Sequence, residues 1–398
     1  MSHGSVFDRL FTGSPPGHDA APMTGPFKER IDAAVVRTVA AHLTRVWPPF
    51  PRQRFVRRAT AGLAELELKA RVQHVAEALA ATLPDDFDRA ADVLEAALAP
   101  ARDDDDLGAL QTGPAGLAGW GTWPLTEFVA AHGLAHPERA LRALHAMTQR
   151  FTAEFAIRPF LVRHEARTLA TLARWVDDPS PHVRRLVSEG SRPRLPWGIR
   201  LTRFVADPSP TLPLLERLQD DPSEYVRRSV ANHLNDVAKD HPGVVAGWLE
   251  RHLPGATPTR RALLRRASRT LVKKGDRRVL RAWGLDAPLC GDATLGITPG
   301  RARIGGELTL TVALASRARR GQPLLVDYVV RRMRPEGGST AKTWKGWRLR
   351  LEPGERRTLT KRHSLRPVTT RRDRPGEHRI ELLVNGRVAA VGSFELRA

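Results

Sequence analysis

One short segment occurs twice in this chain, and the distance between its copies limits what the chain can fold into. The first copy, DDPSPHVRRLVSEG, begins at Asp177, and the second, DDPSEYVRRSVANH, begins at Asp220, 43 residues later. Each copy predicts a helix start, with an aspartate that caps it and a proline in its first turn. A period of this length is typical of paired-helix repeats of the HEAT class, which stack to bury their apolar faces. We therefore expect a helical solenoid with a concave surface.

The residues inside each copy predict which side chains are buried. Valines four residues apart lie on one face of a helix, so we expect them in the core. These valines are Val183, Val187, Val226 and Val230. The arginine pairs then project elsewhere, and they are Arg184 with Arg185 and Arg227 with Arg228. A basic pair repeated once per unit suits a polymer with repeating negative charge.

Three regions of the chain differ in their residue pattern. Residues 1–26 are rich in Gly, Pro, Ser and His without a continuous apolar segment, which predicts a flexible tail and not a signal peptide. Residues 27–285 place apolar side chains at three- and four-residue spacing, as in LELKARVQHVAEALAATL, which predicts helices. Residues 286–398 alternate apolar and polar side chains between turns such as VNGR. The predicted fold is mainly α, a HEAT-like helical-repeat solenoid followed by a small all-β immunoglobulin-like sandwich.

The charge of the chain indicates a polyanionic partner. Lys and Arg number 64 against 43 Asp and Glu, a formal net charge of +21. Such a surface attracts phosphate polymers and makes their binding sensitive to salt. High Arg and Ala with few Lys also fit a GC-rich genome, so compositional drift is an alternative source of part of this charge. The basic segments RRMR and KRHSLRPVTTRRDR of the sandwich are expected to contact the phosphate backbone of such a polymer, or else the sandwich is a stabilising cap.

Several functional classes are excluded by what the sequence lacks. Cys290 is the single cysteine, which rules out an intramolecular disulfide framework and a cysteine-rich zinc site and suits a reducing compartment. The sequence contains no run of about 18 apolar residues, so it predicts no membrane span. The chain contains no P-loop, HExxH or GxSxG motif, and its 14 histidines show no metal-ligand spacing. We therefore expect no metal, no organic cofactor and no membrane partner.

Acidic residues inside basic, aromatic-containing segments are the remaining candidates for chemistry. RFTAEFAIRPF places Glu154 and Arg158 one helical turn apart. VRRLVSEGSRPRLPW surrounds Glu189 with arginines and ends at Trp197. In SVANHLNDVAKDHP, Asp236 lies towards the end of the helix that the second repeat begins.

Each of these residues also has a purely structural interpretation. Glu154 pairs equally well with Arg158 on a helix surface, and such pairs are common. Asp236 can bond a loop, and a lone tryptophan such as Trp197 is usually a packing residue. An acid among arginines, as Glu189 is, is harder to dismiss, although a structural ion pair perturbs its pKa in the same way.

Three longer segments, FTAEFAIRPF, HVRRLVSEGSRPRLPW and YVRRSVANHLNDVAKDHP, closely resemble the DNA alkylation repair glycosylases of the AlkC type, relatives of AlkD built on HEAT-like repeats. The resemblance covers about residues 27–284, and the sandwich resembles the immunoglobulin-like domain that some AlkC branches append. It implies a monofunctional DNA glycosylase of base excision repair. Its substrates would be cationic alkylated bases, 3-methyladenine and 3-methylcytosine, which the family is thought to excise from duplex DNA without base flipping.

The resemblance also implies roles for individual residues. The functional carboxylates fall on Glu154, Glu189 and Asp236, with Glu189 as the principal one, and the active-site tryptophan falls on Trp197. Together with the repeated basic pairs, it predicts these DNA contacts: Arg158, Arg184, Arg185, Arg192, Arg194, Arg227, Arg228 and Lys239. We expect a monomer without an obligate protein partner, acting on double-stranded DNA in the bacterial cytosol and associated with the nucleoid.

Elementary chemistry agrees with these roles. Alkylation at N3 makes the base cationic, and the sugar becomes cationic as the glycosidic bond breaks. A carboxylate near that sugar stabilises the charge and orients water, while arginines hold the phosphates. The alternative is a non-catalytic HEAT-type DNA-binding scaffold, with a protein–protein scaffold third. The acids distinguish these classes, because a phosphate binder gains nothing from carboxylates on its binding face.

Overall fold

The computed structural model describes residues 26–333, 339–367 and 374–398, which form two compact units. One unit extends to Asp240 and the other from His241 to Ala398. The predicted tail, apart from Pro26, lies outside the described residues, as do parts of RRMR and KRHSLRPVTTRRDR. The predicted change from helix to strand at residue 286 falls inside the second unit, because four helices there accompany the sandwich.

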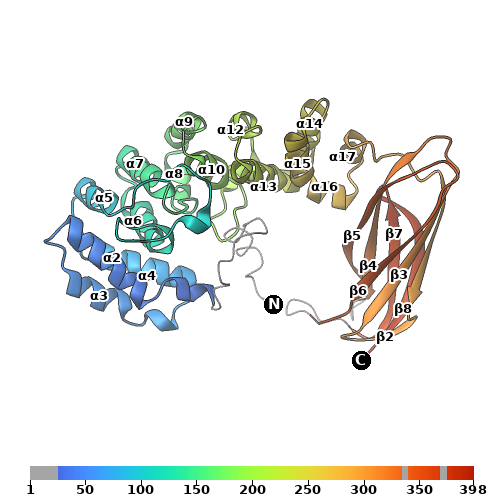
Figure 1. Ribbon diagram of the computed structural model, residues 1–398, viewed down its shortest axis with the longest axis horizontal. Helices are drawn as coiled ribbons and strands as arrows, with labels where there is room; N and C mark the ends of the chain where they lie inside the picture. The colour runs from blue at the N-terminus through green and yellow to red at the C-terminus, as the bar shows by residue number, and fades with distance from the viewer. Residues whose placement is uncertain (1–25, 334–338, 368–373) are drawn as a thin grey trace. The chain divides into compact units, whose positions relative to one another are not determined.

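The first unit is built from helices that pack in neighbouring pairs (Figure 1), with α4 against α6, α5 against α7 and α10 against α13. Its α-helices are α2 Ala33–Val46, α3 Arg52–Thr60, α4 Leu68–Ala80, α5 Phe87–Ala96, α6 Trp123–His132, α7 Pro137–Thr148, α8 Arg158–Arg163, α9 Glu165–Trp175, α10 Pro181–Gly190, α11 Thr202–Ala206, α12 Leu212–Leu218 and α13 Glu224–Asp240. Short 3-10 helices are η1 Phe27–Arg30, η2 Leu63–Glu65, η3 Leu107–Ala109 and η4 Gly119–Thr122.

Helices α10 and α13 are the two copies of the repeated segment. All four predicted core valines are fully buried, which confirms the spacing argument. The aspartate, however, does not cap the helix as predicted. Asp178 accepts a hydrogen bond from the Ser180 backbone N–H, and Asp221 does the same for Ser223. Each aspartate therefore fixes the turn that leads into its helix, because its short side chain reaches the backbone two residues on.

The second unit begins with four helices and ends in a β-sandwich. The helices are α14 Pro242–His252, α15 Pro258–Ala267, α16 Arg269–Lys274 and α17 Arg277–Ala282. One sheet has the order β1-β3-β6, with β1 Gly291–Thr298, β3 Glu307–Ser316 and β6 Arg356–Ser364. The other has the order β2-β8-β7-β4-β5, with β2 Arg301–Arg303, β8 Arg387–Arg397, β7 Gly376–Val384, β4 Gln322–Met333 and β5 Ser339–Leu351.

The two sheets pack face to face over an apolar core. Leu308 and Leu310 of β3 belong to the same buried cluster as Tyr328 of β4 and Phe394 of β8. This alternation of inward and outward side chains is what the period-two pattern predicts. A helical-repeat body followed by an immunoglobulin-like sandwich confirms the predicted fold class.

A hairpin turn connects the sandwich to the helices of its unit. Asn385 and Gly386 both have positive φ, 51° and 73°, and join β7 to β8 as the Asn-Gly signal predicts. Arg277 of α17 donates to the Asn385 carbonyl, and Leu280 packs in one cluster with Leu325 of β4. The helices α16 and α17 are therefore anchored to one end of the sandwich. No helix within the described residues is long and apolar enough to cross a membrane.

Candidate active site

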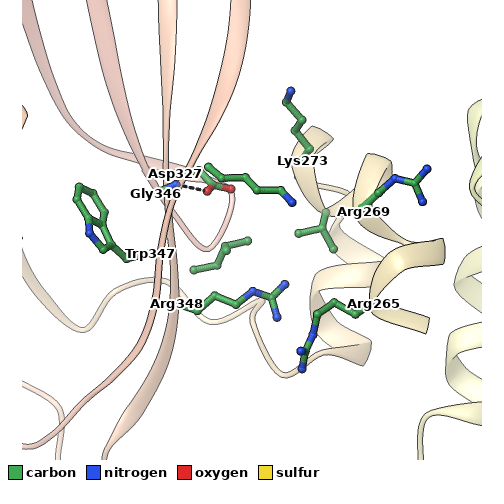
Figure 2. A pocket seen from close by; sticks show the side chains of 10 residues that line it. Arg265, Arg269, Lys273, Asp327, Gly346, Trp347 and Arg348 are labelled. Carbon is green, nitrogen blue, oxygen red and sulfur yellow. Dashed lines mark hydrogen bonds between the residues drawn. The ribbon is translucent and has the colours of Figure 1, made fainter. Parts of the chain in front are cut away.

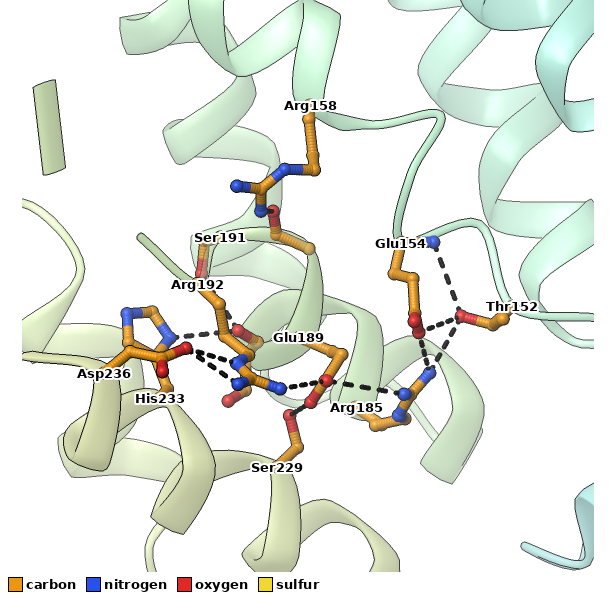
Figure 3. A network of polar contacts seen from close by, with 12 residues as sticks. Thr152, Glu154, Arg158, Arg185, Glu189, Ser191, Arg192, Ser229, His233 and Asp236 are labelled. Atoms are coloured by element: carbon orange, nitrogen blue, oxygen red, sulfur yellow. Dashed lines mark hydrogen bonds and ion pairs between the residues drawn. The ribbon is translucent and has the colours of Figure 1, made fainter. Parts of the chain in front are cut away.

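The three predicted carboxylates come together inside the first unit (Figure 3). Glu154 lies in the segment before α8, Glu189 is near the end of α10, and Asp236 is in the last part of α13. All three are buried, with exposed fractions of 3%, 1% and 2% respectively. Because α10 packs against α13, residues 47 positions apart in the chain meet at one place.

Arginines link these carboxylates into one chain of ion pairs. Arg185 contacts Glu154 at 2.5 Å and Glu189 at 3.8 Å. Arg192 contacts Glu189 at 2.6 Å and Asp236 at 2.7 Å. Lys239 extends the chain to the surface, with its ammonium group 2.8 Å from Asp236. Three carboxylates thus alternate with three cations, an arrangement that keeps buried charges compensated.

Hydroxyl groups complete the contacts of the two glutamates. Thr152 donates to Glu154 at 2.6 Å and itself accepts from Arg185 at 2.8 Å. Ser229 of α13 donates to Glu189 at 2.6 Å. The Ser229 bond favours the ionised form of Glu189, since a hydroxyl donor stabilises negative charge on oxygen.

The electrostatics of the cluster hold Glu189 ionised. Burial alone would raise the pKa of the Glu189 carboxyl. The charges of Arg192 and Arg185 and the Ser229 hydroxyl outweigh burial and hold that pKa well below its usual range. In turn, Glu154 and Glu189 raise the pKa of Arg185, and Glu189 and Asp236 raise that of Arg192, both against the effect of burial.

Trp197 lies in the loop that follows α10, and its backbone is strained. Its φ of 66° is in the left-handed region, where a bulky side chain is rarely found. The residue remains 38% exposed. Strain of this kind persists only where surrounding contacts impose it, and two long side chains supply such contacts here.

Arg158 and Lys69 hold the loop of Trp197 from two sides. Arg158 is fully buried and donates to the carbonyls of Ile199, at 2.5 and 2.7 Å, and Gly190, at 2.8 Å. Burial and the charge of Arg192 lower its pKa to about 10. Lys69 of α4 donates to the Trp197 carbonyl at 2.7 Å. Both cations therefore bind backbone carbonyls of the loop that presents the tryptophan.

The predicted DNA-contact residues fall into three groups. Arg158, Arg185 and Arg192 are buried, so the phosphate contacts predicted for them would require their present bonds to open. Arg184 of α10 and Arg227 of α13 form a second group (Figure 1). Each donates to backbone carbonyls of the turn that precedes its own helix. The remaining three reach the surface, and they are Arg194, Arg228 and Lys239.

Some residues of the site escaped the sequence reasoning. Ser229 occupies the position that Leu186 holds in the first copy. A polar residue at a position that is apolar in the other copy could have indicated a residue of the site. Thr152 lies two residues before Glu154 and was equally visible. Lys69, by contrast, lies more than a hundred residues from Trp197, and no local pattern connects them.

The site contains no arrangement suited to a metal ion. Across the described parts of the chain, His, Cys, Asp and Glu side chains form no group of three or more that could hold one. The carboxylates bind arginines instead. Chemically, the cluster offers three buried carboxylates, and the ionised Glu189 among them stabilises a cation far better in this low-dielectric setting than it would in water.

The chain is similar to known proteins over nearly its whole length. Residues 292–398 match the family described as uncharacterised protein YhaZ, C-terminal Ig-like domain. The uncharacterized protein YhaZ of Bacillus subtilis is 33% identical over 373 residues, covering 93% of this chain and 99% of that protein. The structure of the Pseudomonas fluorescens alkylpurine DNA glycosylase AlkC, bound to DNA containing an abasic site analog, superimposes with a TM-score of 0.83 at 36% identity. It covers 94% of this chain and all of that one.

Proposed function

The chain belongs to the AlkC family of DNA alkylation-repair proteins, and we propose that it is a monofunctional DNA glycosylase that removes cationic alkylated bases from duplex DNA. Its proposed substrates are 3-methyladenine and 3-methylcytosine, excised by water without extrusion of the base from the helix. The observation that carries this proposal is the gathering of Glu154, Glu189 and Asp236 in one buried cluster. A scaffold that only binds phosphates has no use for three such carboxylates.

The chemistry of the substrate explains what the carboxylates do. A base that already carries positive charge leaves without protonation, so no general acid is needed. The difficulty lies in the sugar, which becomes an oxocarbenium-like cation as the bond breaks. A fixed carboxylate lowers the energy of that cation and orients the water that attacks it. This division of labour requires an acid that remains ionised at neutral pH.

Glu189 is the principal carboxylate in this proposal. It occupies the middle of the ion-pair chain, and its pKa is held low by two arginines and a hydroxyl. Glu154 and Asp236 flank it and pair with Arg185 and Arg192 in the free protein.

The buried arginines bind the carboxylates in the free protein and, in this proposal, bind DNA only afterwards. In the free protein Arg185 and Arg192 cover Glu189, which is 1% exposed. A DNA phosphate competes for a guanidinium group as effectively as a carboxylate does. We propose that DNA phosphates draw these guanidinium groups away, which exposes Glu189 to the sugar only when DNA is bound.

Trp197 has a separate role on the surface of the site. Its exposed indole offers a face that attracts cations, so it suits a charged base or sugar. Arg158 and Lys69 are positioning residues in this proposal, because they fix the backbone that carries the indole. Arg194, Arg228 and Lys239 are the proposed phosphate contacts at the surface. The protein is proposed to work as a monomer, in the cytosol, without a protein partner.

The experiment that tests this function is base release under single-turnover conditions. The substrates are duplexes containing 3-methyladenine or 3-methylcytosine, with DNA binding measured in parallel. Wild type should release at least one of these bases and leave an uncleaved abasic strand, without an adduct that borohydride traps. Glu189→Gln should bind DNA normally but release the base on the order of 10³-fold more slowly, as loss of an electrostatic stabiliser does.

The matched control is Glu224→Gln, the same chemical change at the exposed start of α13. It should release the base at the rate of wild type. If wild type binds both duplexes but releases neither base, the glycosylase proposal fails and a DNA-binding scaffold replaces it. If Glu189→Gln keeps full activity, the assignment of the principal carboxylate is wrong.

A further inference from the structure

A basic pocket of about 280 Å³ lies in the second unit, well apart in sequence from the carboxylate cluster. Figure 2 shows side chains from α15 and α16 on one wall and from β4 and β5 on the other. Its basic lining residues are Arg265, Arg269, Lys273, Lys345 and Arg348. Asp327 is the acidic residue among those that line it.

A β-bulge shapes the strand wall of this pocket. Along a regular strand, side chains three residues apart point to opposite faces. The register between β4 and β5 shifts at Val326 and Asp327, so Gly346 is an extra residue on β5. Lys345 and Arg348 therefore both line the pocket, while Trp347 points away from the helices in Figure 2. A bulge re-aims side chains in this way, and it is often found at functional places.

One hydrogen bond and one steric limit maintain the bulge. The Gly346 backbone N–H donates to Asp327 at 3.0 Å. A Cβ at position 346 would lie 2.3 Å from the Val326 carbonyl oxygen, so glycine is required there. The buried Asp327 therefore has a structural partner already, and burial raises the pKa of its carboxyl. This single carboxylate faces the charges of Lys273, Lys345 and Arg348.

Arg265 and Arg348 repel each other across the pocket, whereas the Arg269 guanidinium donates to the Arg266 carbonyl and points away from the strands in Figure 2. Partial burial and the nearby charge of Arg265 lower the pKa of Arg348, although its side chain remains exposed to solvent. Within the described residues, no carboxylate lies within ion-pair distance of Lys273, Lys345 or Arg348. Convergence of like charges raises the energy of the free protein, and a bound anion relieves that cost. The walls cannot separate easily, because Val272 of α16 packs against the cluster that contains Leu280 of α17 and Leu325 of β4.

We propose that this pocket binds a phosphate group, held between Arg265 and Lys273 of the helices and Lys345 and Arg348 of β5. A second hollow of about 770 Å³ shares Arg269, Lys273 and Lys345 with the first. The remainder of the molecule that carries the phosphate has room there. Two sources supply this chemistry, a free phosphate or nucleotide and the phosphate of a nucleic-acid strand. The proposal is independent of the glycosylase activity, because it concerns a different unit and a binding measurement.

The test is calorimetric titration of the full chain with inorganic phosphate, with AMP and with an undamaged DNA duplex, at constant ionic strength. Arg348→Gln, from the strand wall, and Lys273→Gln, from the helix wall, are compared with Arg350→Gln. Arg350 is on the same strand two residues further on, pairs with Glu352 and does not line the pocket. All three variants lose one charge at an exposed position, so they should fold equally well.

Two results would support phosphate binding in the pocket and identify the molecule that supplies the phosphate. If phosphate or AMP binds, and Arg348→Gln and Lys273→Gln each weaken that binding about tenfold, as loss of a charge-assisted hydrogen bond does, the ligand is a free phosphate. If only DNA binds, and the same two variants weaken it more than Arg350→Gln does, the ligand is a nucleic-acid phosphate. If the three variants behave alike with every ligand, the pocket is a solvated surface and the proposal is overturned. Base release, measured on the same samples, reports separately on the proposed activity.

Discussion

Helices α10 and α13 begin with the same sequence pattern and yet contribute different things to the molecule. In both copies an aspartate fixes the entering turn, the first arginine of the pair donates to carbonyls of that turn, and two valines are fully buried. These shared positions explain why the pattern occurs twice, because each helix must start at a defined place and bury one face against its neighbour.

The positions that differ between the copies supply the candidate site. Glu189 of the first copy corresponds to Asn232 of the second, and Leu186 corresponds to Ser229. The second arginine of the pair is buried in the cluster as Arg185, whereas Arg228 is only half-buried. The acid comes from one helix, and the serine that bonds it comes from the other. The repeat thus provides a scaffold, and divergence between its copies provides the chemistry.

The equivalent arginines give the sharpest test of this comparison. Arg185→Met leaves Glu154 and Glu189 buried without their shared cation, so we expect it to lower the free energy of unfolding by about 3–5 kcal/mol. Arg228→Met removes a partly exposed cation and should change it by no more than about 0.5 kcal/mol. Urea unfolding of both variants measures the difference. Equal losses would mean that the two copies are energetically alike.

Much of this organisation was predictable from the sequence, because it depends on local patterns. The valine spacing predicted the buried faces of α10 and α13, and the Asn385–Gly386 pair predicted its hairpin. The carboxylates were proposed from their sequence motifs. What local patterns do not contain is how side chains pair across distance. Burial of Arg158 and Arg185 follows from packing between helices, so their contacts with carbonyls and carboxylates required the structure.

The second test compares His182 with Tyr225, which occupy the same position in the two copies. Their rings pack edge to face, with 5.7 Å between the ring centroids. Burial, with the charge of Arg185, lowers the pKa of His182 to about 4, although Asp104 opposes this. The folded protein keeps this imidazole neutral, whereas the unfolded chain protonates it near pH 6.5. Its contribution to stability is therefore complete above pH 6.5 and is lost as the pH falls towards 4.

His182→Phe keeps the ring and removes the titrating group. In wild type the free energy of unfolding falls as the pH decreases from 6.5 to 4. In His182→Phe the slope of this fall should be smaller by about 1.4 kcal/mol per pH unit, the contribution of one titrating group. The slope that remains includes the buried His233, whose pKa burial also lowers to about 4. Tyr225→Phe is the control, because it removes no group that titrates in this range. Unfolding series at several pH values decide the matter, and an unchanged slope in His182→Phe would contradict the low pKa.

The smallest expected effect concerns the loop after α10, where the two copies differ most in backbone. Positions 234–240 of the second copy continue as helix, whereas the corresponding positions 191–197 of the first form the loop that ends at Trp197. Trp197→Gly and Trp197→Ala both remove the indole, but only glycine accepts a φ of 66° without strain. We expect the glycine variant to be more stable than the alanine variant by about 1 kcal/mol. At Ile199, which is exposed and does not have positive φ, alanine should be the more stable of the two. Thermal unfolding of the four variants measures these differences in stability. If the glycine variant is the more stable one at both positions, the effect reports loop flexibility and not strain at Trp197.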